Sequence, residues 1–375
     1  MLRTALAVIL VFSSTTLTSA SIWESSGWAL TGVFSGKTGY DSNLTLTHDG
    51  SGDGFVRADP SLTLRRKDSS SEFDLTSGVT ATDYFDHREP FQTDYKFSTT
   101  YFYPKTEDNT PPVIQANASW AKITEANAWL GLYVEHERGA VDATGLVPLT
   151  GKLGIRTSGA FVRDDYPLRR LNNYQQGDLS AGLAYERASG TEISLNIGGA
   201  LGSSTPNDAA AGGTIHSREG FVTARIEGRI LPKVSGSAYA GYSAVSYHGA
   251  YHHRYDRPVG GADLTWSATT RTTWVLAAYS GSDFSPDGQE VHSTHGFLSF
   301  THVIIDQWQV TVRGGPAYAV FSRTVRQSAD LLWEFGSEIA YQPSDRFRVA
   351  LGLTYDRQNA DVLNNQFERE AVSLG

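Results

Sequence analysis

The segment Phe347–Asp356 constrains the fold most, because its residues alternate between apolar and polar without interruption. Side chains of a β-strand alternate between the two faces of a sheet, so this segment predicts a strand with one apolar and one polar face. The apolar face begins with Phe347 and ends with Tyr355. A tilted strand of about 9–11 residues crosses a bilayer, and aromatic side chains favour both interfaces. A soluble sandwich can also contain one such strand, so the number of repeats decides between these folds.

The same alternation recurs along the chain. The clearest repeats occupy residues 56–65, 73–82, 179–186, 192–201 and 222–230. We predict an all-β fold, a closed antiparallel transmembrane β-barrel of about 18 strands, with 16 as the alternative because the segments within 104–151 are weak. Lipid cannot satisfy backbone amide groups, and only a closed barrel has no unpaired edge. A β-helix would show a fixed short repeat, which we do not find. The alternation alone does not exclude a soluble sandwich.

The connections between the repeats alternate in length. Tight turns are predicted at residues 67–70, 188–190, 231–233, 268–271, 304–306 and 342–345. Long polar loops are predicted at 35–53, 164–177, 202–219, 247–257, 281–293, 315–329 and 357–366. Two segments go against this trend, a short loop at 122–126 and a long turn at 137–151. Short periplasmic turns and long extracellular loops are the plan of an outer-membrane barrel. We therefore expect both termini on the periplasmic side and loops that narrow the outer mouth.

Residues 1–20 have the features of a secretory signal peptide. Arg3 supplies a positive charge, an apolar run extends from Ala5 to Phe12, and small residues end at Ala20. We predict a signal peptide at 1–20 and one barrel domain at 21–375, located in the bacterial outer membrane. No later segment approaches about 20 consecutive apolar residues, which predicts no transmembrane helix. The chain has no cysteine, so disulfides do not stabilise it.

Short motifs resemble the putative beta-barrel porin (type 2) family of outer-membrane proteins. These are Gly39–Asn43, Pro60–Leu62 followed by Arg65 and Arg66, and the closing segment Arg369–Gly375. The resemblance covers essentially the whole chain after the leader and implies a Gram-negative outer-membrane barrel with porin activity or a role in exopolysaccharide export. It implies no catalytic residues. Barrels of this kind usually end in an aromatic residue that the insertion machinery reads, whereas this chain stops at Leu374–Gly375. We expect either a truncated sequence or an unusually short closing strand.

The polar faces of the predicted strands carry charges of both signs. The predicted lumen-lining residues are Arg57, Arg65, Arg156, Arg225, Arg229, Arg313, Arg348, Glu186, Glu192, Glu227, Glu334, Glu338 and Asp356. Charges inside a wide barrel are solvated and can set ion selectivity. The simpler interpretation is that they pair across strands and only line the wall. As a set they predict a wet lumen, since about 16–18 strands leave room for an aqueous channel.

Two loop clusters could bind metal, and we favour neither. His248, His252 and His253 lie near Asp256, but Tyr- and His-rich loops are also ordinary surface loops. Asp41, Asp49 and Asp53 form an acidic first loop together with Gly50, Gly52 and Gly54, but this loop lacks the downstream Glu of an EF-hand. No nucleophile elbow or H-E-x-x-H motif occurs, so we predict no enzyme. We predict no metal and no cofactor.

The predicted function is a passive porin-like channel for small hydrophilic solutes. Alternatives are an outer-membrane conduit for exopolysaccharide export and a rim-site enzyme or structural barrel without a pore. Expected partners are outer-membrane lipid, the barrel-insertion machinery, and small hydrophilic solutes or a polysaccharide. The formal charge of −9 without a basic patch predicts no nucleic acid. No interface from which to read an oligomeric state is evident.

Overall fold

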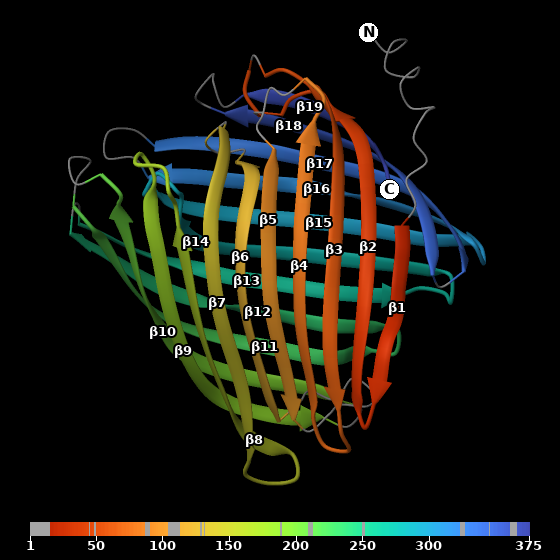
Figure 1. The fold of residues 1–375 in the computed structure, drawn as a ribbon. Helices are drawn as coiled ribbons and strands as arrows, with labels where there is room; N and C mark the ends of the chain where they lie inside the picture. The colour runs from red at the N-terminus through yellow and green to blue at the C-terminus, as the bar shows by residue number, and fades with distance from the viewer. Residues whose placement is uncertain are drawn as a thin grey trace.

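Nineteen antiparallel strands form one continuous sheet in a computed structural model of the chain (Figure 1). The structure describes residues 16–375 except 45, 49, 87–90, 104–112, 128–129, 131, 188–189, 209–212, 250–251, 323–326, 345 and 361–365. The strands are β1 (Thr16–Ser25), β2 (Trp28–Asp41), β3 (Asp53–Lys67), β4 (Glu72–Tyr84), β5 (Gln92–Tyr103), β6 (Ile114–Asn127), β7 (Leu132–Pro148), β8 (Leu153–Asp165), β9 (Asn172–Arg187), β10 (Thr191–Pro206), β11 (Ile215–Leu231), β12 (Val234–Gly249), β13 (His253–Ser267), β14 (Thr272–Phe284), β15 (Glu290–Ile305), β16 (Trp308–Ser322), β17 (Gln327–Ser344), β18 (Phe347–Ala360) and β19 (Phe367–Leu374).

Eighteen of these strands, β2 to β19, close into a barrel. Each pairs with the next strand in sequence, and β19 pairs back onto β2 from Ala371↔Asp41 to Leu374↔Thr38. Strand β1 lies in the same seam beyond the end of β19, where it pairs with β2 and, at Thr16↔Arg348, with β18. The predicted closed barrel of about 18 strands is confirmed. Residues 16–20 of the predicted signal peptide belong to β1, whereas residues 1–15 lie outside the described part. Cleavage of the leader stays a prediction.

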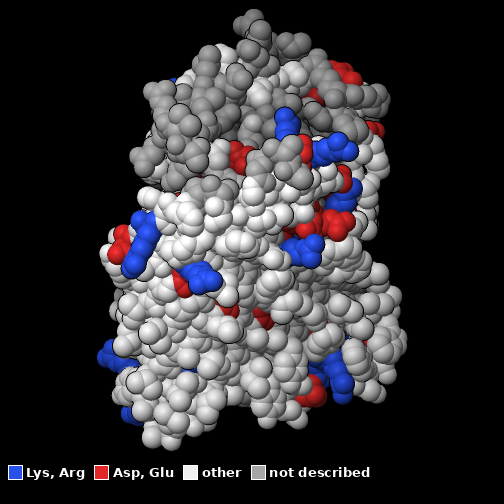
Figure 2. Space-filling model, turned by 90° about the vertical axis from the view of Figure 1, so that its left-hand side faces the viewer, with Lys and Arg blue, Asp and Glu red and all other residues white. Residues whose placement is uncertain are grey.

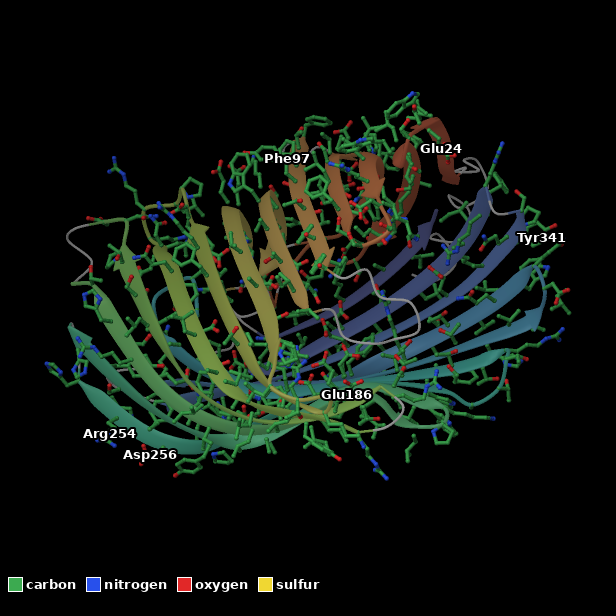
Figure 3. The ribbon with its side chains drawn as sticks, turned by 90° about the horizontal axis from the view of Figure 1, so that it is seen from below. Glu24, Phe97, Glu186, Arg254, Asp256 and Tyr341 are labelled. Carbon is green, nitrogen blue, oxygen red and sulfur yellow. The ribbon has the colours of Figure 1, made fainter. Side chains whose placement is uncertain are left out.

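The two faces of the wall differ in polarity. On β10, Ile197 and Leu201 are 70% and 66% exposed, whereas Ser194 and Asn196 of the same strand are buried on the inner face. Phe97 of β5 and Tyr341 of β17 likewise lie on the outside (Figure 3). Figure 2 shows an uncharged band on the outer surface between charged residues nearer the two ends. An apolar outer band around a polar interior is the pattern of a transmembrane barrel, because lipid covers the outer side chains.

The strands continue further toward the loop end than the sequence predicts. Seven predicted long loops shrink, for example 202–219, of which residues 202–206 and 215–219 belong to β10 and β11. The predicted turn at 137–151 is wrong, because residues 137–148 belong to β7, and the predicted loop at 122–126 lies within β6. Backbone pairing does not need apolar side chains, so strands extend beyond the apolar band. The architecture of short turns at one end and longer connections at the other is that of an outer-membrane barrel.

Among the described residues, no helix is long and apolar enough to cross a membrane.

Candidate functional site in the barrel lumen

The 13 predicted lumen-lining residues all occupy inner-face positions in the strand register. Arg156 on β8 illustrates how the strands place them, because its partner on β9 is Gly182, which has no side chain. The Arg156 guanidinium reaches Glu192 on β10 with two hydrogen bonds, 2.5 and 2.6 Å long. Both side chains are almost fully buried. This geometry makes the pair a rigid part of the wall.

Most of the other predicted lining residues also form ion pairs. Arg65 bonds Asp74 at 2.8 Å, and Arg225 lies 3.0 Å from Glu227. Further pairs join Arg57 to Asp59, Arg348 to Glu338, and Asp356 to Arg369. Among the described residues, no ion pair involves Arg229, Arg313, Glu186 or Glu334. Paired charges contribute mainly to the wall, which leaves the unpaired ones to act on solutes. Their role in selectivity stays a prediction.

A group of three carboxylates was missed by the sequence reasoning. Asp142 on β7, Asp178 on β9 and Glu219 on β11 lie on one cross-strand row, in which each pairs in register with an intervening alanine of β8 or β10. Asp178 is within electrostatic range of both of the others. No ion pair involves them in the described part of the chain, although Asn117 donates a hydrogen bond to Asp142. The alternation around Asp178 placed it on the polar face, but strand spacing gave no sign that the three meet.

Two cations lie on other inner walls. Lys37 on β2 and Arg313 on β16 are within electrostatic range of one another, and Lys37 is also within range of Arg57 and Arg369. Neither Lys37 nor Arg313 has an ion-pair partner among the residues that the structure describes. In an 18-strand ring, β2 and β11 are nine strands apart, and so are β16 and β7. Lys37 and Arg313 therefore lie on the wall opposite the three carboxylates.

The β14–β15 hairpin folds into the lumen near the loop end. Strand β14 pairs with β13 only as far as Ser280↔Gly260 and then leaves it. The Phe284 ring packs against inner-face tyrosines of two other strands, Tyr174 of β9 at 5.7 Å and Tyr247 of β12 at 5.5 Å between ring centroids. The tip is tied to β9 by a 2.7 Å hydrogen bond from the Asn172 amide to the Pro286 carbonyl. A hairpin that touches β9 must cross part of the lumen, since four strands separate β9 from β14.

Polar contacts fasten the base of this hairpin. The Arg257 guanidinium of β13 lies 2.8 Å from Nδ1 of His292 on β15 and stacks over the Tyr255 ring. Tyr255 and Tyr247 share a 3.2 Å hydroxyl contact, and buried Glu290 accepts a hydrogen bond from Tyr255. These contacts replace the missing backbone pairing between β13 and the end of β14.

The first loop narrows the lumen from another side. The backbone amide of Ser42 donates to the Glu370 carbonyl of β19 at 2.9 Å, and Asn43 Nδ2 donates to the Glu368 carbonyl at 3.2 Å. Leu46 is buried, and it packs against the inner-face residues Ala317, Leu332 and Phe367. The inward hairpin and this loop bear out the expectation that segments at the loop end narrow the mouth.

A luminal cavity remains below the hairpin. It has a volume of about 650 Å³, and its lining includes Arg156, Asp178, Glu219, Arg225, Tyr239 and Ser280. The lining combines two of the unpaired carboxylates with the Arg225–Glu227 ion pair, with Arg156 of the buried pair, and with the Tyr239 phenol. Such a surface can hydrogen-bond small polar molecules and attract cations.

The candidate metal clusters are not assembled as ligand sets. In the described residues, no three His, Cys, Asp or Glu side chains are placed to hold a metal. Of the acidic loop, Asp41 pairs with Arg369 at 2.5 Å, and both Asp53 carboxylate oxygens accept from the Asp86 amide. Asp49 lies outside the described residues. The His248 and His252 rings are 5.6 Å apart on the outer rim.

No protein-family model matches the chain, and no curated protein matches it. Solved structures with a similar fold include the copper transporter OprC, with a TM-score of 0.49 at 7% identity over 96% of this chain and 81% of that one. The outer membrane protein OpdK from Pseudomonas aeruginosa has a TM-score of 0.47 at 8% identity, and the match covers 92% of this chain and 97% of OpdK. The FrpB iron transporter from Neisseria meningitidis has a TM-score of 0.46 at 8% sequence identity. The match covers 90% of this chain and 62% of the length of that transporter. A likeness this distant does not indicate a shared function. The function proposed for this chain therefore rests on its own residues.

Proposed function

We propose that the protein is a passive channel of the bacterial outer membrane for small hydrophilic solutes. The observation that carries the proposal is the polar lumen, with its cavity of about 650 Å³, inside a wall whose outer face is apolar. Solutes diffuse down their gradient, and the inward β14–β15 hairpin and the first loop limit their size. The porin motifs further support membership in the type 2 family, which we include in the proposal.

The opposed charges support a selectivity for this channel. The three carboxylates of β7, β9 and β11 face Lys37 and Arg313 across the lumen, which sets up a field transverse to the barrel axis. Small dipolar solutes orient in such a field, and the excess of carboxylates favours cations over anions. An exporter of an anionic polymer would need a lumen dominated by Arg and Lys, so the mixed charges favour the porin over the conduit. The absence of enzymatic activity remains part of the proposal.

Swelling of liposomes that contain the refolded protein tests solute passage directly. We expect pentoses and hexoses to enter, with rates that fall steeply for di- and trisaccharides because the hairpin narrows the mouth. Liposomes with folded protein that admit none of these sugars would contradict the proposal. Passage of long polysaccharide without size selection would favour the conduit instead.

A further inference from the structure

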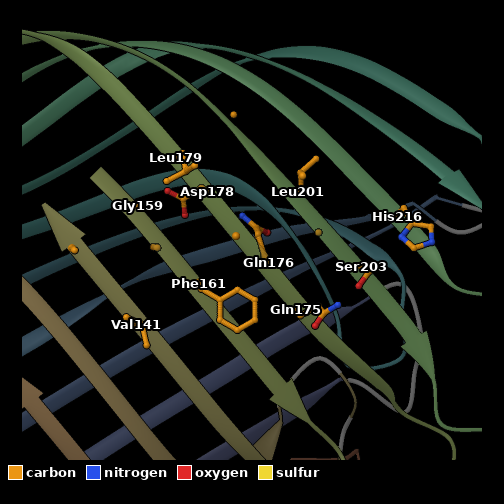
Figure 4. Close-up of a pocket in the computed structure, with 15 residues that line it drawn as sticks. Val141, Gly159, Phe161, Gln175, Gln176, Asp178, Leu179, Leu201, Ser203 and His216 are labelled. Atoms are coloured by element: carbon orange, nitrogen blue, oxygen red, sulfur yellow. The ribbon is translucent and has the colours of Figure 1, made fainter. Parts of the chain in front are cut away.

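A groove lies on the outer face of the barrel over β7 to β11 (Figure 4). It has a volume of about 760 Å³ and is bordered by Val141, Phe161, Leu179 and Leu201, all well exposed. Glycines of β8, β9 and β10 line it, and their missing side chains hollow the surface. The groove opens on the outer face, because its exposed lining residues alternate along β9 with Gln176 and Asp178, which border both the groove and the luminal cavity.

The end of the groove nearest the loops is polar and basic. Gln175, Ser203 and His216 lie along this end (Figure 4) and form one cross-strand row. Arg218 lies in the next outer-face row, two residues after His216 on β11. It pairs in register with Leu201 of β10 and with Ser246 of β12, and Ser246 pairs with Arg254 of β13. A single serine therefore separates two outer-face arginines, of which Arg218 is in register with the groove residue Leu201.

These arginines are available to a ligand. Arg254 projects from the outer surface (Figure 3), with its side chain 75% exposed. Its neighbour Asp256 is 3.9 Å away, which is a weak contact. Arg218 is exposed, and no ion pair involves it among the described residues. Guanidinium groups bind phosphate through paired hydrogen bonds, and more strongly at a membrane interface than in bulk water.

We propose that this groove binds a phosphate-bearing lipid of the leaflet at the loop end, with an acyl chain over the glycines and its phosphate on Arg218 and Arg254. Acyl chains in a bilayer gain little from an apolar groove, so the headgroup must supply the specificity. A second copy seated through the same patch would bring like charges together, which favours lipid as the occupant. The proposal rests on the membrane location in the proposed function, but not on an open pore.

Native mass spectrometry of the detergent-purified protein tests this proposal with two probes, dioleoyl phosphatidylglycerol and dioleoylglycerol. They share their acyl chains and differ in the phosphate-bearing headgroup. We expect the phospholipid to bind about tenfold more tightly than the diacylglycerol, as a charge-assisted contact to phosphate predicts. The variant Arg218→Gln with Arg254→Gln should remove this difference.

Two further variants locate the ligand. Gly177→Leu fills the groove, because a Cβ there meets only ordinary contacts at 3.6 Å from Phe161 and 3.8 Å from the Ala160 carbonyl. It should weaken binding of both probes. Arg357→Gln is the matched control, since Arg357 is an outer-face arginine of β18, far from the groove, whose side chain is 52% exposed. Its binding should match that of the unchanged protein.

The proposal would be overturned if the unchanged protein bound both probes equally. It would also be overturned if Arg357→Gln reduced phospholipid binding as much as the double arginine variant does. A third contradicting result would be that the protein forms oligomers without lipid and that Gly177→Leu dissociates them. This result would mean that a second copy of the chain occupies the groove. Heat-dependent gel mobility verifies that every variant is folded. Solute passage is not read in this experiment, so its failure leaves the channel proposal untouched.

Discussion

At the scale of single residues, burial separates the ion pairs that hold the wall from those that do not. Arg156 and Glu192 are 12% and 6% exposed, whereas Arg57 and Asp59 are 46% and 28% exposed. Removing one partner of a buried pair leaves an uncompensated charge. We expect Glu192→Ala to lower the free energy of unfolding by about 3 kcal/mol and Asp59→Ala by less than about 1 kcal/mol. Urea unfolding in detergent micelles measures both, and equal effects would show that the lumen hydrates Arg156 as well as Arg57.

The unpaired charges make a second prediction at this scale. Neutralising Asp178 and Glu219 together, as Asn and Gln, should reduce the preference for cations, because these groups face the cavity without ion-pair partners among the described residues. Neutralising Lys37 and Arg313 as Gln should increase it. The reversal potential under a KCl gradient reports both changes. Shifts of the same sign in the two variants would refute the roles of these charges in ion selectivity.

At the scale of elements, the inward β14–β15 hairpin is the segment that we propose to limit the width of the mouth. Phe284→Ala removes the ring held between Tyr174 and Tyr247 and should free the hairpin. We expect a larger single-channel conductance with more frequent fluctuations. Phe335→Ala, on the outer face of β17 where the ring is 49% exposed, is the control and should leave conductance unchanged. An unchanged conductance in Phe284→Ala would mean that the hairpin does not limit the pore.

The strands were predictable from the sequence, and the hairpin was not. Alternation identifies Phe347–Asp356 as a strand and places Arg348 and Asp356 on the inner face, because the period of two is a local property. Residues 281–293 read as a loop, although most belong to β14 and β15. Their inward path depends on contacts with Tyr174 and Tyr247, which are distant in sequence. The meeting of Asp142, Asp178 and Glu219 likewise depends on the registers of five strands, which single segments do not encode.

At the scale of the whole molecule, the barrel requires an apolar outer face at bilayer depth. Leu195 is 59% exposed on the outer face of β10, and Leu195→Arg should cost about 2–4 kcal/mol of folding free energy in lipid vesicles if it lies near the midplane. Thr223→Arg, on the inner face beside the cavity, should cost much less because the lumen holds water. Folding yields of the two variants in vesicles compare them. Equal losses would argue against lipid around β10.

The proposed function depends on a water-filled path that runs through the barrel past the inward hairpin. Single-channel conductance of the refolded protein in a planar bilayer measures whether this path is open. We expect steady, ohmic current steps with a mild preference for cations. Silence from protein shown to be folded and inserted would contradict it, because a wet lumen that is open at both ends must conduct ions.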